Sequence, residues 1–287
     1  MNQRAFRFGA SLTASQSRSQ WQQAAGEIEA LGYDTLLVPD HLGMVAPLPA
    51  LVSAAAVTDR IRLGTFVLNA GFSRAALLAR DVAGVDQLID GRLELGLGAG
   101  FARSEFEAAG LEFPSAGGRI DHLESTVTGL RALLADPDHH PRPVQQRIPL
   151  VIAGQGDRLL RLAARHADIV GISGARPGTD PTQKGTLAER VALIRTAAAD
   201  RFAELELNLM VIGLHVVGTG PADLSLARMF YPDLTDAELL TVPGVLHGTP
   251  DQIADTLHRY RETFGITYFT IPGHCAQAFA KVIPHLR

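Results

Sequence analysis

Glycines cluster in one segment of this chain, Gly96-Leu97-Gly98-Ala99-Gly100-Phe101, directly after Leu93-Glu94-Leu95. Glycine lets a backbone lie against a flat or anionic ligand and adopt a positive φ at little cost. A break of this kind at the end of a buried strand is where an α/β enzyme usually binds its ligand. A plain tight turn between a strand and a helix is the alternative.

The spacing of these glycines excludes the two common nucleotide-binding motifs. A P-loop needs Lys and then Ser or Thr after its second glycine, and the sequence Phe101-Ala102-Arg103 supplies neither. A dinucleotide fingerprint needs glycine at position 101 or 103, where Phe101 and Arg103 stand. An N-terminal dinucleotide-binding unit is therefore not expected.

The pair Asp40-His41 follows the apolar stretch Thr35–Pro39 and is the best candidate for proton chemistry. Imidazole titrates near neutral pH, and a nearby carboxylate can fix its tautomer and raise its basicity. We therefore predict that His41 and Asp40 are the catalytic residues. The alternative is that Asp40 caps a helix and His41 only packs.

A further turn, Gly154-Gln155-Gly156-Asp157, begins a helix directly after a strand. Free backbone N–H groups and the helix dipole favour an anion there, and Arg158 adds positive charge nearby. A phosphate group is the expected ligand. The alternative is a plain turn in which Asp157 caps the helix.

Composition limits the classes of function. The chain is 46% hydrophobic and 20% charged, as in globular proteins, and its formal charge of −4 argues against nucleic-acid binding. No apolar run approaches the ~20 residues of a membrane span, and Met1 to Arg4 lack an apolar signal core, so we expect a cytoplasmic protein with no membrane partner. Cys275 is the only cysteine, which excludes an internal disulfide and any cysteine-rich metal site.

Apolar runs alternate with helical patterns along the chain, which predicts one domain over residues 1–287. The predicted strands are Phe6–Ala10, Thr35–Pro39, Ile61–Leu68, Leu93–Leu97, Leu150–Ala153, Ile169–Ile172, Leu207–Val216 and Ile266–Ile271. The predicted helices are Arg18–Leu31, Ala75–Ile89, Arg119–Ala135, Leu159–Arg165, Leu187–Phe202 and Pro250–Phe264. Eight strands with intervening helices favour an α/β fold of the (β/α)8 TIM barrel type, and a doubly wound open sheet is the alternative.

In a TIM barrel, the functional residues lie at the carboxyl ends of the strands. The predicted ends hold Ser11, Asp40, His41, Asn69, Ala70, Gly71, Gly98, Ala99, Gly100, Ala153, Gly154, Gln155, Gly156, Ser173 and His274. This set contains one acid, two histidines and many small residues. It lacks a pair of catalytic carboxylates, a Schiff-base lysine and three metal ligands in one place, so no metal is expected. Small residues with few charges suit a broad planar ligand.

At this point the order and spacing of several segments resemble the luciferase-like monooxygenase superfamily, in particular its actinobacterial branch of coenzyme F420-dependent oxidoreductases. The resemblance spans nearly the whole chain. It rests on Glu29 to Thr35 leading into Pro39-Asp40-His41, Arg60 to Thr65, Asp86 to Gly100, Arg119 to Glu124, Ile148 to Gly154, Ala163 to Asp168, and Gly248-Thr249-Pro250.

The resemblance implies a barrel with the deazaflavin ring across its C-terminal mouth. It assigns Asp40 and His41 to the site, and it places a non-proline cis peptide behind the ring within Asn69-Ala70-Gly71. It also implies that Gly98, Ala99, Gly100 and Ser104 face the ring and its side chain, and that Ala153, Gly154, Gln155 and Gly156 contact the phosphate with Ser173 nearby. We assign Ser11, Phe101 and His274 to the substrate pocket. A homodimer is implied by analogy.

Three departures from the family pattern point away from glucose-6-phosphate as substrate. Ser73-Arg74-Ala75 stands where members often have Arg-His-Pro, and Phe101 stands where the sugar-phosphate dehydrogenases have glutamate. Those enzymes also use a tryptophan just after the histidine, whereas Trp21 is the only tryptophan here.

We therefore expect an F420-dependent oxidoreductase that transfers a hydride between the deazaflavin and a small, largely apolar organic substrate. One alternative is a monooxygenase that uses reduced FMN and O₂ with a separate reductase. Another is a non-catalytic flavin-binding protein. Residues 221–242 form an excursion between the last two predicted strands, and its Phe230-Tyr231-Pro232 segment is expected to line either a pocket or an interface.

Overall fold

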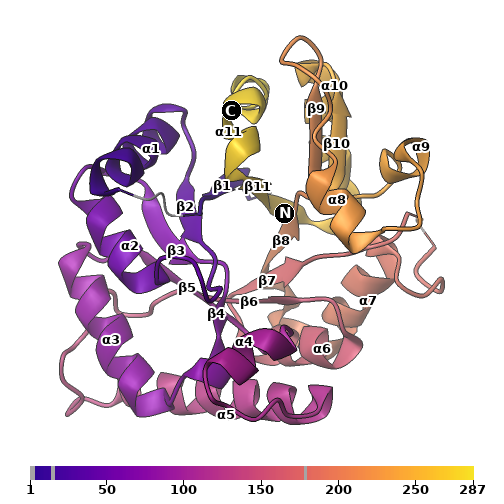
Figure 1. Cartoon of the computed structure of the whole chain (residues 1–287). Helices are drawn as coiled ribbons and strands as arrows, with labels where there is room; N and C mark the ends of the chain where they lie inside the picture. Colours follow the sequence, from indigo (N-terminus) through magenta and orange to yellow (C-terminus); the bar gives the residue numbers. More distant parts are fainter. Residues whose placement is uncertain (1–3, 14–16, 178–179) are drawn as a thin grey trace.

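A closed ring of eight parallel strands forms the centre of the molecule, and helices surround it (Figure 1). The computed structural model describes residues 4–13, 17–177 and 180–287. The ring closes because β3 pairs with β5, while β1 pairs with both β2 and β11. The barrel strands are β1 (Arg7–Ser11), β2 (Thr35–Val38), β3 (Arg62–Thr65), β5 (Leu93–Gly98), β6 (Leu150–Gly154), β7 (Ile169–Ile172), β8 (Glu206–Met210) and β11 (Ile266–Pro272).

This architecture confirms the predicted (β/α)8 barrel. The strands are short and almost entirely buried, as expected where side chains fill the barrel on one face and helices cover the other. The outer helices are α1 (Arg18–Ala30), α2 (Pro47–Ala55), α3 (Ala75–Leu88), α5 (Ala116–Ala135), α6 (Asp157–His166), α7 (Leu187–Ala198) and α10 (Pro250–Phe264). Short 3-10 turns, η1 (Ala70–Phe72), η2 (Ala199–Ala203), η3 (Gly273–Cys275) and η4 (Ile283–His285), complete the connections.

Helix α10 begins and ends where local sequence signals predict it. Thr249 caps its first turn in a reciprocal pair with Gln252, and Pro250 occupies the first helical position. Gly265 ends the helix in a left-handed conformation at φ 75°. Helix α2 is not among the helices predicted from the sequence. Its run of small and apolar residues lacks the alternation of polar and apolar positions that predicts a surface helix.

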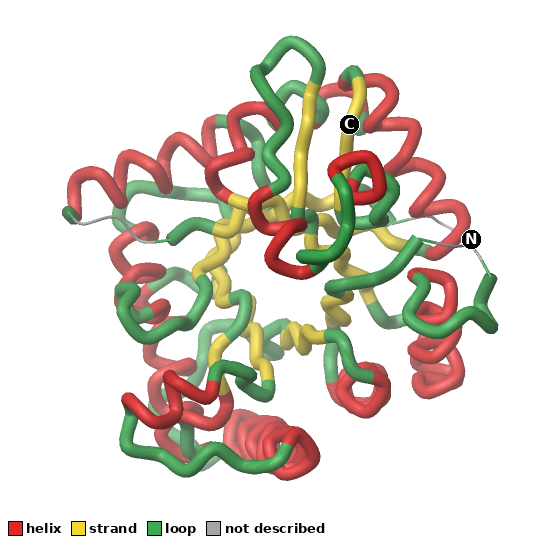
Figure 2. The backbone as a smooth tube through the Cα atoms, turned by 45° about the vertical axis from the view of Figure 1, so that its right-hand side comes forward, coloured by secondary structure: helices red, strands yellow, loops and turns green. Residues whose placement is uncertain are grey.

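The predicted strand Leu207–Val216 is wrong as a single element. The chain turns at Val211 and Ile212, so that β8 ends inside the barrel and β9 (Gly213–Val216) leaves it. Strand β9 pairs in parallel with β10 (Val245–Gly248), a strand that the sequence analysis did not predict. These two strands stand outside the ring, with the short helices α8 (Ser225–Phe230) and α9 (Asp236–Leu239) in the connection between them (Figure 2).

Within the described ranges, no helix has the length and apolarity that crossing a membrane requires. The expectation of a cytoplasmic protein rests partly on Met1 to Gln3, which lie outside the described residues.

Asp168 links the loop after α6 to the start of β6 through a hydrogen bond. Its lowered pKa predicts how the stability of the protein depends on pH. Burial opposes its ionisation, but hydrogen bonds from Arg147 at 2.7 Å and from the backbone N–H of Leu150 at 2.9 Å, with the charge of Arg131, hold the pKa of this carboxyl below its usual 3.8. Asp168→Asn is expected to lower the free energy of unfolding at pH 7 by about 1–3 kcal/mol, because charged hydrogen bonds are lost.

A group with a lowered pKa stabilises the fold above its unfolded pKa, and the stabilisation is lost as the pH falls through the folded pKa. Urea unfolding of the two proteins should therefore converge as the pH drops below 3.8. Asp81→Asn, which removes an exposed partner of Arg80, is the control and should have little effect. A difference for Asp168→Asn that stays constant from pH 7 to pH 3 would contradict this assignment.

Candidate active site at the mouth of the barrel

A cavity of about 670 Å³ opens at the carboxyl ends of the barrel strands. Its walls come from the segment after β2, from β4 (Leu68–Asn69), β5, β6, β7 and the end of β8, from α6 and the short helix α4 (Arg103–Ala108), and from α8 of the excursion. The lining residues are Asp40, His41, Phe66, Val67, Leu68, Asn69, Gly98, Ala99, Gly100, Phe101, Glu105, Ala153, Gly154, Gln155, Leu159, Gly171, Ser173, Met210, Leu226, Met229 and Phe230. A volume of this size suits a ligand of cofactor dimensions.

Gly98, Ala99 and Gly100 form one wall of this cavity, which we call the glycine face. A Cβ on Gly98 would lie 2.6 Å from Cγ2 of Val67, and a Cβ on Gly100 would collide with the amide of Asn69. Gly100 also has φ 72°, a conformation that favours glycine. A side chain at either position would therefore displace Val67 or Asn69, two residues that line the same cavity.

The cis peptide implied by the resemblance is present, but it joins Phe66 to Val67 and does not lie within Asn69-Ala70-Gly71. The predicted strand Ile61–Leu68 assumed an unbroken element. In the structure β3 ends at Thr65, and the chain pairs again with β5 only over β4. The irregular backbone therefore falls earlier than predicted, and Val67 packs against Gly96 and Gly98.

Asp40 lines the cavity but bonds the backbone and not the imidazole beside it. Its Oδ2 accepts a hydrogen bond from the N–H of Asn69 at 2.9 Å, which links the end of β2 to β4. Burial raises the pKa of Asp40, and this hydrogen bond only partly offsets the shift. Asp40, the carboxylate expected to pair with His41, therefore links the ends of two strands.

The carboxylate that bonds His41 is Glu105, which the sequence analysis missed. Nδ1 of His41 lies 2.8 Å from Oε1 of Glu105, and the His41 ring meets the edge of Phe101 at 6.0 Å between centroids. The glycine turn leads directly into α4, so the position of this segment in the sequence indicated that the first turn of α4 lies close to the cavity. Ser104 was chosen there, yet its side chain is exposed and Glu105 lines the cavity.

The start of α6 lies at another edge of the cavity, where Gly154 and Gln155 are lining residues. The first N–H groups of a helix have no partner within it, so they remain available to an anion. Arg158 does not add its charge there, because its guanidinium bonds Asp121 and the carbonyl of Gly117. Asp157 pairs with Lys184 at 3.3 Å and does not cap the helix, since Gly156 holds the capping position.

Six predicted site residues do not line the cavity. Ala70 is fully buried in η1, and Gly71 packs against the ring of Phe106. Ser104 and Gly156 are exposed beside the cavity, and Ser11 ends β1 away from the lining residues. His274 lines a second cavity.

The wall opposite the glycines is apolar. Leu226, Met229 and Phe230 come from α8, and Met210 ends β8. The hydroxyl of Tyr231 donates a hydrogen bond to the carbonyl of Ala175 at 3.0 Å, which ties the end of α8 to the segment after β7. Phe230 belongs to the segment for which the sequence left a pocket and an interface as alternatives, and the structure places it in a pocket.

Trp21 is buried among the outer helices, where its indole N–H donates a hydrogen bond to the carbonyl of Ala50 at 2.8 Å.

Comparison with known proteins places this geometry among redox enzymes. The model of the luciferase-like monooxygenase family matches residues 5–235. An F420-dependent glucose-6-phosphate dehydrogenase of Amycolatopsis mediterranei is 30% identical over 163 residues, which cover 49% of this chain and 49% of that protein.

Two solved structures share the fold over nearly the whole chain. The F420-dependent tetrahydromethanopterin reductase of Methanopyrus kandleri has a TM-score of 0.78 at 18% identity and covers 99% of this chain and 100% of its own. A monooxygenase of Streptomyces bottropensis has a TM-score of 0.73 at 20% identity and covers 98% of this chain and 100% of its own. At these identities the likeness concerns the fold.

Proposed function

Because the chain belongs to the luciferase-like monooxygenase family, we propose that it is an F420-dependent oxidoreductase that transfers a hydride between the deazaflavin and a small, largely apolar organic substrate. The observation that carries the proposal is the pair His41–Glu105 beside the glycine face of the cavity. It combines a place for a flat ring with a group that can move a proton. The F420-dependent relatives support the choice of coenzyme.

The residues present fit such a coenzyme. Gly98, Ala99 and Gly100 line the cavity with no side chain larger than a methyl group, which suits a flat ring. The start of α6 offers backbone N–H groups to a phosphate on the coenzyme's side chain, with Gln155 and Ser173 on the same wall. When bound, F420 would supply or accept the hydride, and the protein would supply orientation and a proton.

His41 is the residue we assign to the proton. An ionised Glu105 accepts a hydrogen bond from Nδ1–H of His41, which leaves Nε2 as the atom that can take or release a proton. The imidazole is 36% exposed, so Nε2 is accessible to a substrate oxygen or carbon in the cavity.

The lining residues favour an apolar substrate. Phe101 is 77% exposed at the rim, and Met229 is 78% exposed on the facing wall. Large exposed apolar side chains on both sides of one opening are typical of a surface that a ligand covers. We assign these residues to the substrate, and the glycine face to the coenzyme.

Titration of the purified protein with F420 and with FMN, followed by coenzyme fluorescence, tests the proposal. We expect F420 to bind at least tenfold more tightly than FMN, a difference of about 1.4 kcal/mol. Oxidation of reduced F420 by a panel of small ketones, aldehydes and enones should then reveal turnover. Tighter binding of FMN, with O₂ consumption when a flavin reductase is added, would instead support the monooxygenase alternative. Tight coenzyme binding with no turnover on the panel would favour a non-catalytic role.

Glu105→Gln is expected to lower kcat about tenfold and to leave the dissociation constant of F420 within about twofold. The amide oxygen still accepts Nδ1–H, but a neutral acceptor is weaker than a carboxylate by about 1.4 kcal/mol. Steady-state kinetics on an accepted substrate and the coenzyme titration measure the two quantities. Glu107→Gln, on the exposed side of the same helix, is the matched control and should leave both unchanged. An equal loss in both variants would remove Glu105 from the mechanism.

A further inference from the structure

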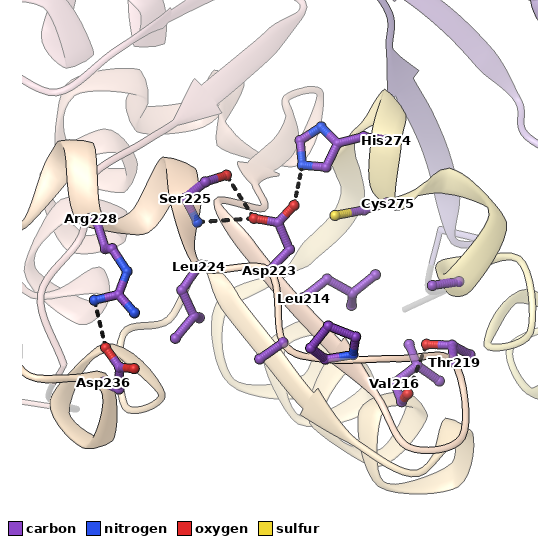
Figure 3. Close-up of a pocket in the computed structure, with 13 residues that line it drawn as sticks. Leu214, Val216, Thr219, Asp223, Leu224, Ser225, Arg228, Asp236, His274 and Cys275 are labelled. Atoms are coloured by element: carbon purple, nitrogen blue, oxygen red, sulfur yellow. Dashed lines mark hydrogen bonds and ion pairs between the residues drawn. The ribbon is translucent and has the colours of Figure 1, made fainter.

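A second cavity, of about 630 Å³, lies between the excursion and the carboxyl end of β11 (Figure 3). Helix α8 separates it from the mouth of the barrel. Ser225 and Arg228 of this helix line the second cavity, while Leu226, Met229 and Phe230 line the first. The second cavity is therefore a distinct space that shares one wall with the proposed active site.

Three side chains with metal-binding atoms meet in this cavity. One carboxylate oxygen of Asp223, one ring nitrogen of His274 and Sγ of Cys275 all lie within 4.8 Å of one another. Figure 3 shows the three side chains pointing toward a common centre. The sequence analysis expected no such set, because Asp223 is far along the chain from His274 and reaches it only through the fold of the excursion.

The carboxylate of Asp223 is held in place before any ligand arrives. The backbone of Asp223 exchanges two hydrogen bonds with Leu214, at 3.0 and 2.9 Å. Its Oδ1 accepts hydrogen bonds from the N–H and the hydroxyl of Ser225, at 2.9 and 2.6 Å. Its Oδ2 is directed to Nε2 of His274 at 2.6 Å. Such support fixes the donor atoms of a site and reduces the entropy that binding must overcome.

A nucleophilic thiol is the competing interpretation of a cluster that contains cysteine, histidine and aspartate. Cys275 is only 5% exposed, and a cysteine buried in this way is usually a poor nucleophile. A bound cation would displace the proton, as metals do at cysteine ligands.

We propose that Asp223, His274 and Cys275 form a binding site for Zn²⁺ or a divalent cation of similar size and softness. A thiolate, an imidazole and a carboxylate are ligands that Zn²⁺ accepts and that Mg²⁺ and Ca²⁺ do not select. Zn–S and Zn–N bonds of about 2.3 and 2.0 Å need donor atoms about 3–4 Å apart, and the three donor atoms here lie within 4.8 Å of one another. All three residues line the second cavity, which has room for water or a small anion as a further ligand.

An ion at this site would join the start of α8 to the end of β11. The other face of α8 forms the apolar wall of the proposed active site, so the ion would stabilise that wall. The role inferred for the metal is structural and does not depend on the coenzyme.

Titration of the metal-free protein with Co²⁺ tests this proposal by absorbance. Cys275 is the only cysteine, so a thiolate-to-cobalt charge-transfer band can arise from this site alone. We expect the band to appear and to saturate at one equivalent of Co²⁺, and Zn²⁺ to abolish it by competition. Zn²⁺ should also raise the thermal unfolding temperature of the wild type.

Variants distinguish this site from surface binding. Cys275→Ser should abolish the charge-transfer band, and His274→Ala should weaken Co²⁺ binding at least tenfold, by about 1.4 kcal/mol, and remove the thermal shift. His274 is 57% exposed, so its loss should not prevent folding, which circular dichroism checks. His285→Ala is the matched control, because His285 pairs with Asp251 at 2.6 Å on the surface, and it should bind Co²⁺ as the wild type does. No band in the wild type, or the same affinity in His274→Ala, would overturn the proposal.

Discussion

His41→Ala is expected to lower kcat by about 10²- to 10⁴-fold, the usual loss when a general acid or base is removed. The variant lacks Nε2, the atom assigned to the proton, and leaves the carboxylate of Glu105 without its partner. The glycine face and the start of α6 are unchanged, so the dissociation constant of F420 should stay within about threefold of the wild-type value. Stopped-flow oxidation of reduced F420 measures the first quantity, and fluorescence titration measures the second.

His166→Ala is a matched control for this prediction. His166 also pairs with a glutamate, since its Nε2 lies 3.0 Å from Oε1 of Glu124, but the pair lies on the outer helices away from the cavity. Its loss should leave kcat within about twofold of the wild-type value. If His41→Ala retained full turnover, or lost turnover only in proportion to coenzyme binding, the proton role of His41 would be wrong.

Arg7→Met is expected to lower the free energy of unfolding by about 3–5 kcal/mol, which corresponds to a fall in Tm of about 10 °C. Arg7 lies at the end of the barrel opposite the cavity, where its guanidinium bonds Glu94 at 2.7 Å and Glu206 at 2.5 Å. It also lies 4.3 Å from the ring centre of Tyr268, whose hydroxyl donates a hydrogen bond to Glu94 at 3.0 Å. Without Arg7, the two buried carboxylates lose the partner they share, although Arg62 lies 3.8 Å from Glu94 and the charge of Arg4 still acts on Glu206.

The pH dependence of Arg7→Met follows from these carboxylates. Burial already raises the pKa of Glu206, and the charge of Arg7 opposes this rise. Removing Arg7 raises it further, and a group with a raised pKa loses its contribution to stability as the pH increases through that value. The destabilisation should therefore be smaller at pH 5 than at pH 8. Denaturant unfolding at both values measures it.

Arg103→Met is the control for this second prediction, because it removes an exposed arginine whose pair with Glu107 spans 3.8 Å. It should change stability by less than about 0.5 kcal/mol. Adding Glu94→Gln and Glu206→Gln to Arg7→Met should recover part of the loss, since the unpaired charges are then gone. If Arg7→Met lowered the free energy of unfolding no more than Arg103→Met does, the two carboxylates would not need Arg7 and the prediction would be wrong.

The choice between F420 and FMN determines what chemistry the site can support. A deazaflavin has carbon in place of the ring nitrogen that supports oxygen chemistry, so a hydride reaction and an O₂ reaction require different coenzymes. The cavity holds the His41–Glu105 pair, to which we assign the proton, and an apolar wall, and a hydride transfer to a carbonyl or an alkene would use both. The coenzyme titration is therefore the first experiment to perform.

The fold could be predicted from local patterns in the sequence. Eight short apolar runs alternate with helices, and the connection lengths suit parallel strands, so a closed barrel follows from the periodicity and from chain connectivity. Gly98 and Gly100 at the end of β5, and Gly154 at the end of β6, are also local signals, since each marks a backbone position with no room for a side chain. Most of the residues that line the first cavity were therefore within reach of sequence reasoning.

Only the tertiary structure decided which side chains meet. Glu105 faces His41 while Ser104 faces solvent, because successive residues of a helix point about 100° apart and the sequence does not specify how a six-residue helix is rotated. Asp223 reaches His274 and Cys275 only because the excursion folds back onto the end of β11. Backbone patterns repeat locally and can be recognised in the sequence, whereas contacts between distant side chains depend on how whole elements pack.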